Sequence, residues 1–198
     1  MISSNFKIFY FALCLGVISC NQNQSKKIPV ISSKFQNLEV KKELEGMDIR
    51  SHLNKKVNLY NFSDKLQLIN FFFVSCPTIC PAMENELTPL AREYKEKDVI
   101  FLSFTINPES DDIESLNIHA KKIKSGQNRL FLRTNKNNIE KLASLYLAQI
   151  KNGEDKFFYH TSQVVLLDKS MKIRGLYDIL NKDEVDLLEE DIEILLKN

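Results

Sequence analysis

The chain has 198 residues, enough for one domain of ordinary size with a sizeable buried core and a short appendage. Hydrophobic residues make up 43% of it and charged residues 27%, a composition typical of globular proteins. Its 27 Lys and Arg residues are balanced by 26 Asp and Glu residues, which gives a formal net charge of +1. This balance does not indicate a basic face for nucleic acid, and no glycine-rich phosphate-binding motif indicates a nucleotide site.

The first residues differ in character from the rest of the chain. An apolar stretch over residues 8–18 follows a single early lysine; it is short for a membrane-spanning helix and has the proportions of a signal-peptide core. It ends in "VISC", which resembles the bacterial lipobox, where the peptide is cut before the cysteine and that cysteine is diacylated. We therefore expect a signal peptide over 1–19, a lipidated Cys20 with a polar tether over 20–45, and a folded domain over 46–198.

This prediction places the domain on a bacterial membrane, held by a lipid anchor, in the periplasm or elsewhere outside the cytoplasm. The alternative is a simple secretory signal with an incidental cysteine. In the lipobox interpretation Cys14 leaves with the signal peptide and Cys20 carries lipid, so only Cys76 and Cys80 remain as thiols. Exported dithiols oxidise readily, and keeping this pair reduced requires a thiol-reductant protein as a partner.

The first predicted elements lie around the cysteine pair. The segments "MDIR" and "KKVNLY" bracket the polar "SHLN" and predict a small hairpin on the N-terminal side of the core. Residues 66–74, "LQLINFFFV", form a nearly unbroken apolar run, which is typical of a strand covered on both faces. After the cysteines, apolar residues at helical spacing predict a helix that Pro89 interrupts.

The rest of the chain alternates between strands and helices. Asp111 and Glu114 form a plausible N-cap and N3 pair for the second helix. The predicted elements are a buried strand over 99–106, a helix ending near Gly126, a strand over 129–133, a helix over 137–150, two strands joined by a "DKS" turn within 157–179, and an amphipathic helix over 181–198. This order predicts an α/β fold of the thioredoxin-like class, in which helices flank a central mixed sheet with an N-terminal hairpin addition.

Cys76 and Cys80 follow the first core strand at positions i and i+4. Pro77 lies between them where the first turn of a helix tolerates proline. On a helix or a tight loop-to-helix turn both sulfurs face the same direction, and a helix N-terminus favours the thiolate form. Two such thiolates suit a soft metal or a labile, redox-active disulfide, and the spacing leaves both possibilities open.

A third ligand would favour a metal, and the sequence has three histidines. His52 lies in the predicted hairpin turn and His119 in a helix near two lysines, so we interpret both as solvated surface residues. His160 opens the last buried strand pair, whose entrance lies against the cysteine loop in a thioredoxin-like fold; the alternative is a partly buried histidine bonded to backbone. Met83, one turn beyond Cys80, is interpreted as a core residue rather than a metal ligand.

Three segments together resemble the Sco/SenC family of tethered thioredoxin-fold proteins: "NFFFVSCPTICPAM", "FTINPESDDIESLNIHAKK" and "FYHTSQVVLLD". The resemblance implies that copper, as Cu(I) or Cu(II), is bound by Cys76, Cys80 and His160. It also implies a metallochaperone rather than an enzyme, which delivers copper to the CuA site of cytochrome c oxidase or maintains that site's cysteines. The implied partners are the CuA-bearing subunit of the oxidase, or another copper acceptor, and no nucleic acid.

Two positions depart from the family's pattern. Asn107 stands before Pro108 where the family often has aspartate, and Tyr159 stands before His160 where it again often has aspartate. Because carboxylates beside a metal site orient and charge its ligands, these departures bear on copper affinity and redox tuning.

A rival function is thiol–disulfide chemistry. General exchangers normally have Cys-x-x-Cys and a cis-proline before a later strand, whereas this chain has three residues between its cysteines and no proline near "FYHTSQ". A peroxiredoxin-like peroxidase is disfavoured because Phe73 stands where that class has threonine. A dedicated reductase or redox sensor that acts on partner cysteines through a Cys76–Cys80 disulfide remains the alternative to copper delivery.

Overall fold

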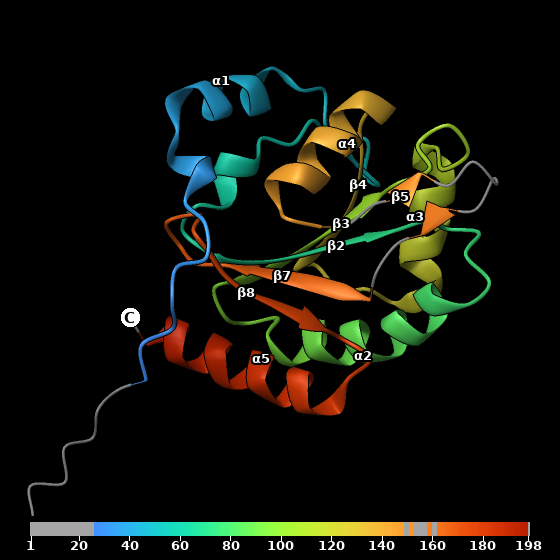
Figure 1. Cartoon of the computed structure of the whole chain (residues 1–198). Coiled ribbons are helices and arrows are strands. Elements are labelled where there is room, and N and C mark those ends of the chain that lie inside the picture. Colours follow the sequence, from blue (N-terminus) through green and yellow to red (C-terminus); the bar gives the residue numbers. More distant parts are fainter. Residues whose placement is uncertain (1–25, 149–150, 153–157, 160–161, 198) are drawn as a thin grey trace, which may run out of the picture.

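The computed structural model describes residues 26–148, 151–152, 158–159 and 162–197 (Figure 1). The predicted signal peptide, its boundary at residue 19 and the lipidated Cys20 lie outside these residues. No helix in the described ranges is long and apolar enough to cross a bilayer.

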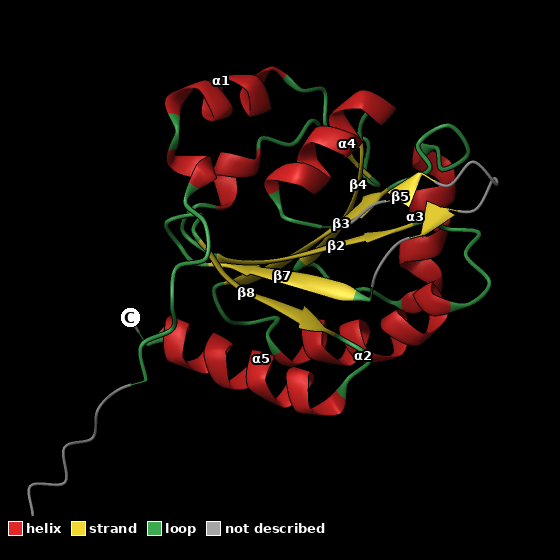
Figure 2. Cartoon of the chain, viewed as in Figure 1, coloured by secondary structure: helices red, strands yellow, loops and turns green. Residues whose placement is uncertain are grey.

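One six-stranded mixed sheet organises the molecule (Figure 2). Its strands, in spatial order, are β1 (Arg50–Ser51), β4 (Arg129–Arg133), β3 (Val99–Thr105), β2 (Leu66–Phe72), β7 (Gln163–Leu167) and β8 (Ile173–Asp178). β2, β3 and β4 are parallel, while β1, β7 and β8 run antiparallel to their neighbours. β5 (Lys151–Asn152) and β6 (Phe158–Tyr159) pair separately with each other.

Helices cover both faces of this sheet. The α-helices are α1 (Leu38–Gly46), α2 (Ile79–Glu93), α3 (Ile113–Ile123), α4 (Lys136–Leu145) and α5 (Lys182–Leu196). In Figure 1, α1 and α4 lie on one face, α2 and α5 on the other, and α3 lies at the end where the parallel strands finish. The predicted mixed α/β sheet flanked by helices is confirmed.

The alternation of side chains along β2 explains why both faces need helices. Leu66 and Leu68 pack in a core shared with α2 and α5, whereas Ile69 and Phe71 pack in a second core shared with α1 and α4. Successive strand residues point to opposite faces, so a strand with apolar residues on both faces must be covered twice. The nearly unbroken apolar run was the correct signal for a central strand.

The N-terminal region is more structured than a hairpin alone. The expected turn forms, because the Val57 N–H donates to the Ile49 carbonyl at 2.8 Å, but only β1 joins the sheet, where it pairs with β4. α1 was not predicted; the Asn37 side chain caps it by accepting from two backbone N–H groups. Residues 26–45, expected to be part of the tether, include all of this helix except Gly46 and also include the fully buried Phe35.

Two details of the predicted helices need correction. α2 is one continuous helix with Pro89 inside it, so this proline does not divide the element. The N-cap of α3 is Asp112 rather than Asp111, because the Asp112 carboxylate accepts a hydrogen bond from the Ser115 N–H at 2.8 Å.

Gly175 in β8 provides a test of the packing. A Cβ atom there would lie 2.1 Å from the hydroxyl oxygen of Tyr177, which is buried and donates a hydrogen bond to Asp191. Gly175→Ala should therefore lower the free energy of unfolding by about 1–3 kcal/mol, measured by urea denaturation.

Gly46 supplies the matched control, since a Cβ there meets nothing within 4 Å. Gly46→Ala should leave the free energy of unfolding unchanged or raise it by at most about 1 kcal/mol, because Gly46 is the last residue of helix α1 and alanine favours helices more than glycine does. Equal destabilisation by both substitutions would contradict the packing described around Tyr177.

Candidate metal centre

The cysteine pair lies between the end of β2 and the start of α2. Cys76 belongs to the connecting loop and Cys80 to the first turn of the helix. Both are buried, with exposed fractions of 7% and 4%, and no disulfide joins them. The backbone N–H of Cys80 donates a hydrogen bond to the Cys76 sulfur at 3.4 Å. The predicted approach of the two thiols at a helix N-terminus is therefore present.

The two sulfurs have different acid–base properties. Burial acts to raise the pKa of the Cys76 thiol, but hydrogen bonds from the backbone N–H groups of Cys80, Thr78 and Ile79 and from the Cys80 side chain together hold it below the usual value. Burial raises the pKa of the Cys80 thiol far above its usual range, and the negative charges of Cys76 and Glu84 add to this. Cys76 is thus the more acidic and more nucleophilic of the two thiols, and Cys80 holds its proton more tightly.

Apolar side chains pack against one side of the two cysteines. Besides the cysteines, this cluster consists of Phe72 from β2, Leu116 and Ala120 from α3, and Phe131 from β4. Three elements far apart in the sequence therefore keep water away from one side of the dithiol, which strengthens the electrostatic interactions at the sulfurs.

The loop after β3 supports the cysteine loop. The Asp111 carboxylate accepts hydrogen bonds from the Val74 N–H, at 3.0 Å, and from the Thr105 hydroxyl. The Thr105 hydroxyl in turn accepts from the Asn107 N–H at 3.0 Å. Asp111, interpreted from the sequence as a helix cap, instead ties the end of β3 to the segment that carries Cys76.

The two histidines expected at the surface are not solvated. His52 is only 7% exposed; its Nδ1 accepts from the Phe131 N–H at 3.2 Å, and burial lowers its pKa. The His119 side chain is 14% exposed, stacked on Phe72 at 5.5 Å and edge-on to Phe131 at 5.1 Å between ring centroids. Those interpretations were wrong because β4 and α3 pack against His52, while β2 and β4 pack against His119.

The sequence analysis also missed a buried ion pair behind the cysteines. Arg129, with 0% exposure, donates from Nη1 and Nη2 to the two carboxylate oxygens of Glu84 at 2.7 and 2.9 Å. His119 faces the same carboxylate, with Nε2 3.7 Å from Oε1. Glu84 follows Cys80 by four residues and so lies on the same side of α2. An arginine at the start of the apolar "RLFLR" strand was the available signal for a buried partner.

Of the two remaining residues considered for the site, the structure describes Met83 but not His160. Met83 is buried in the core shared with α2 and α5, as expected for a packing residue. His160 lies outside the described residues. Within those residues, no group of three His, Cys, Asp or Glu side chains is arranged to hold a metal ion.

A mixed sheet that carries a dithiol between its first long strand and the following helix defines a thioredoxin-like domain. The family model described as SCO1/SenC matches residues 41–196. This chain therefore belongs to the SCO1/SenC family.

Comparisons with individual proteins agree with this assignment. The chain is 28% identical over 158 residues to the SCO1 protein homolog of Bacillus subtilis, covering 76% of this chain and 81% of the relative. It superposes with a TM-score of 0.65 and 27% identity on BsSco, described as a Sco family cytochrome c oxidase assembly protein with a disulfide switch, covering 74% and 89% of the two chains. Copper-bound ScoI of Arabidopsis thaliana gives a TM-score of 0.63 at 22% identity, covering 77% and 97%. The thioredoxin-like fold is confirmed.

The unequal acidities predict unequal reactivity. In the reduced, metal-free protein near neutral pH, iodoacetamide should alkylate Cys76 at least about tenfold faster than Cys80, because the thiolate is the reacting species. The Cys76 rate should also level off at a lower pH than that of an ordinary cysteine, since its pKa is depressed. Peptide mass spectrometry of timed samples measures both rates.

Unfolding in urea provides the control, because it removes the helix N-terminus and should make the two rates similar. Faster alkylation of Cys80 in the folded protein would contradict the assignment of Cys76 as the more acidic thiol.

Proposed function

We propose that this chain is a membrane-tethered copper metallochaperone that binds copper through Cys76, Cys80 and His160 and delivers it to the CuA site of cytochrome c oxidase. The observation that carries the proposal is the buried cysteine pair at the N-terminus of α2 in a member of the SCO1/SenC family. Copper-bound structural neighbours of this family support copper as the cargo.

The dithiol chemistry suits Cu(I). Soft thiolate ligands favour this ion, and Cys76 is already biased toward the thiolate form. Cys80 holds its proton in the metal-free protein, so loading copper onto both sulfurs releases a proton from Cys80. An incoming thiolate of the acceptor can then replace one sulfur at a time, so that copper moves by ligand exchange without any change in the protein's covalent bonds.

The topology supports His160 as the third ligand. β7 runs antiparallel to β2, and Val164 pairs with Asn70, so the start of β7 lies beside the end of β2, where the cysteine loop begins. The Ser162 carbonyl accepts from the Ile179 N–H at 3.0 Å, which fixes the chain just before β7. His160 precedes Ser162 by two residues, a span of at most about 7 Å. This supports an imidazole within reach of the cysteine loop.

A specific observation also favours a second function, that of a dedicated thiol–disulfide reductase. The pKa of Cys76 is lowered, which suits a nucleophilic cysteine, and the pKa of Cys80 is raised, which suits a resolving cysteine that acts second. The Cys76 thiolate would attack a partner disulfide and form a mixed disulfide, releasing one partner thiol. Cys80, after losing its proton, would then displace the second, leaving a Cys76–Cys80 disulfide and a reduced partner. A thiol-reductant protein would restore the dithiol.

The membrane tether is part of the proposal. The lipobox-like sequence places a lipid on Cys20, six residues before Lys26, where the described chain begins. Lys26 forms ion pairs with Glu190 at 2.9 Å and Asp191 at 3.0 Å on α5. The tether would therefore hold the domain close to the membrane, outside the cytoplasm.

Anaerobic titration with Cu(I) tests the ligand set. The reduced domain should bind about one copper ion per chain, and His160→Ala should weaken binding by more than about tenfold, because removing even supporting groups around a metal costs that much. Competition with a chromophoric Cu(I) chelator measures the affinities.

His52→Asn is the matched control, because its amide oxygen can accept the same hydrogen bond from the Phe131 N–H. It should bind copper as the parent does. If His160→Ala binds as tightly as the parent while the dithiol still reduces a model disulfide at the parent's rate, the chaperone proposal fails and the reductase function is favoured.

A further inference from the structure

A cavity lies near the carboxyl ends of β3 and β4. It has a volume of about 490 Å³ and contains three cationic side chains, those of Arg50, Arg133 and Lys136. Two carboxylates, Asp48 and Glu109, also line it. In open α/β sheets the crevice outside the carboxyl ends of the strands is the usual place for a ligand.

Two of the cations form an unfavourable pair. Arg50 of β1 and Arg133 of β4 lie directly opposite each other in the antiparallel ladder. Like charges in this position destabilise a sheet. In the described part of the chain, Arg50 forms an ion pair with Asp48 at 3.3 Å, whereas Arg133 has no carboxylate within ion-pair distance, although its charge, after the hydrogen bonds from Ser115, helps to lower the pKa of the Asp112 carboxyl. Since the Arg50 and Asp48 side chains are 43% and 63% exposed, their ion pair offsets little of the repulsion. The sheet thus keeps two like charges together at the cavity wall.

The other hydrogen bonds leave positive charge available in this cavity. Arg133 donates from Nη2 to the Pro108 carbonyl at 2.7 Å, but its buried Nε has no acceptor among the described residues. Lys136 has no carboxylate within ion-pair distance in the described part of the chain. It is also the first residue of α4, where the helix adds partial positive charge.

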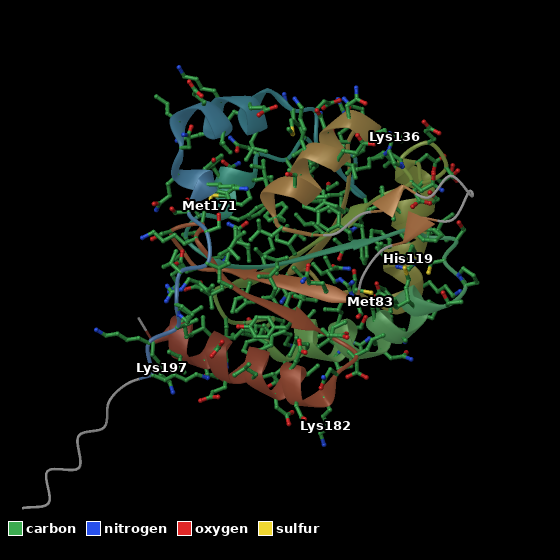
Figure 3. The ribbon with its side chains drawn as sticks, viewed as in Figure 1. Met83, His119, Lys136, Met171, Lys182 and Lys197 are labelled. Carbon is green, nitrogen blue, oxygen red and sulfur yellow. The ribbon has the colours of Figure 1, made fainter. Side chains whose placement is uncertain are left out.

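The cavity and the dithiol share one supporting loop. Pro108 and Glu109 line the cavity, and Asp111, two residues further on, accepts the hydrogen bond from Val74 in the cysteine loop. In Figure 3, Lys136 and His119 lie at the same end of the molecule, whereas Lys197 lies at the other. The loop over residues 108–111 therefore links the cavity wall to the segment that carries Cys76, and a partner that contacts both must span this loop.

We propose that the cavity lined by Arg50, Arg133 and Lys136 is a docking site for acidic side chains of the protein that exchanges ligands or thiols with the dithiol. This inference rests on the proposed function in one respect: both require a partner protein that exchanges ligands or thiols with the dithiol. Carboxylates bridging Arg50 and Arg133 would relieve the repulsion between them, which explains why the unfavourable pair is tolerated. A small free anion offers the same chemistry, and the test distinguishes it from an acidic polypeptide.

Binding of a hexaglutamate peptide to the reduced, metal-free protein tests the proposal. Isothermal titration at low ionic strength should show binding that weakens with added salt. Lys136→Gln should weaken it by about fivefold, as loss of one exposed ion pair does. Arg50→Gln should weaken it similarly without lowering the thermal midpoint, because it also removes the like-charge pair.

Lys182→Gln is the matched control. Lys182 is the first residue of α5 as Lys136 is of α4, and each follows an asparagine N-cap, yet Lys182 lies far from Lys136 in Figure 3. This variant should bind the peptide as the parent does. Equal losses in Lys136→Gln and Lys182→Gln would overturn the proposal, because they would show that the peptide responds to net charge alone.

Inorganic phosphate is the probe for a small anion. If phosphate binds in a Lys136-dependent manner while the peptide does not bind, the cavity is a small-anion site and the docking proposal is overturned. Copper titration of the parent protein reports separately on the proposed function, so a failure of peptide binding with intact copper binding contradicts the docking site alone.

Discussion

The hydrogen bond from the Cys80 N–H to the Cys76 sulfur is the interaction on which the candidate site depends. It exists because β2 ends just before the cysteines and α2 begins between them, so that the unpaired N–H groups of the first helical turn point at one sulfur. The same geometry buries Cys80 one turn deeper, above the Glu84 carboxylate, and so raises the pKa of its thiol. One short connection thereby gives two identical side chains different chemistry.

Other parts of the fold keep this connection in place. Asp111 holds the cysteine loop to the end of β3, and Phe131 of β4 packs beside the sulfurs. Behind them, the buried Glu84–Arg129 pair joins α2 to β4. Replacing one member would leave an unpaired buried charge, which costs far more than the pair itself contributes. The site is therefore supported by β3, β4 and α2 at once, although both cysteines come from one loop and one helical turn.

The parts of the fold governed by local pattern could be predicted from the sequence. The apolar runs of β2 and β3, the helical spacing after the cysteines and the approach of Cys76 and Cys80 all follow from side-chain periodicity and from i, i+4 geometry. The choice of Asp112 over Asp111 as the α3 cap depends instead on a tertiary hydrogen bond that occupies Asp111.

Burial of polar residues could not be predicted in the same way. His52 lies in a polar turn segment and His119 lies near two lysines; the packing of β4 and α3 against His52, and of β2 and β4 against His119, encloses them. The partner of Arg129 is 45 residues away in the chain, and the repulsion between Arg50 and Arg133 appears only once the register of β1 against β4 is known. Such long-range pairings have no local sequence signature.

X-ray absorption spectroscopy of the copper-loaded protein tests the central claim most directly, because it reports the atoms bound to the metal. The proposed site predicts two sulfur neighbours and one imidazole nitrogen around Cu(I), with the nitrogen signal lost in His160→Ala. A spectrum of the parent protein that shows sulfur neighbours alone, unchanged by that substitution, would contradict the account.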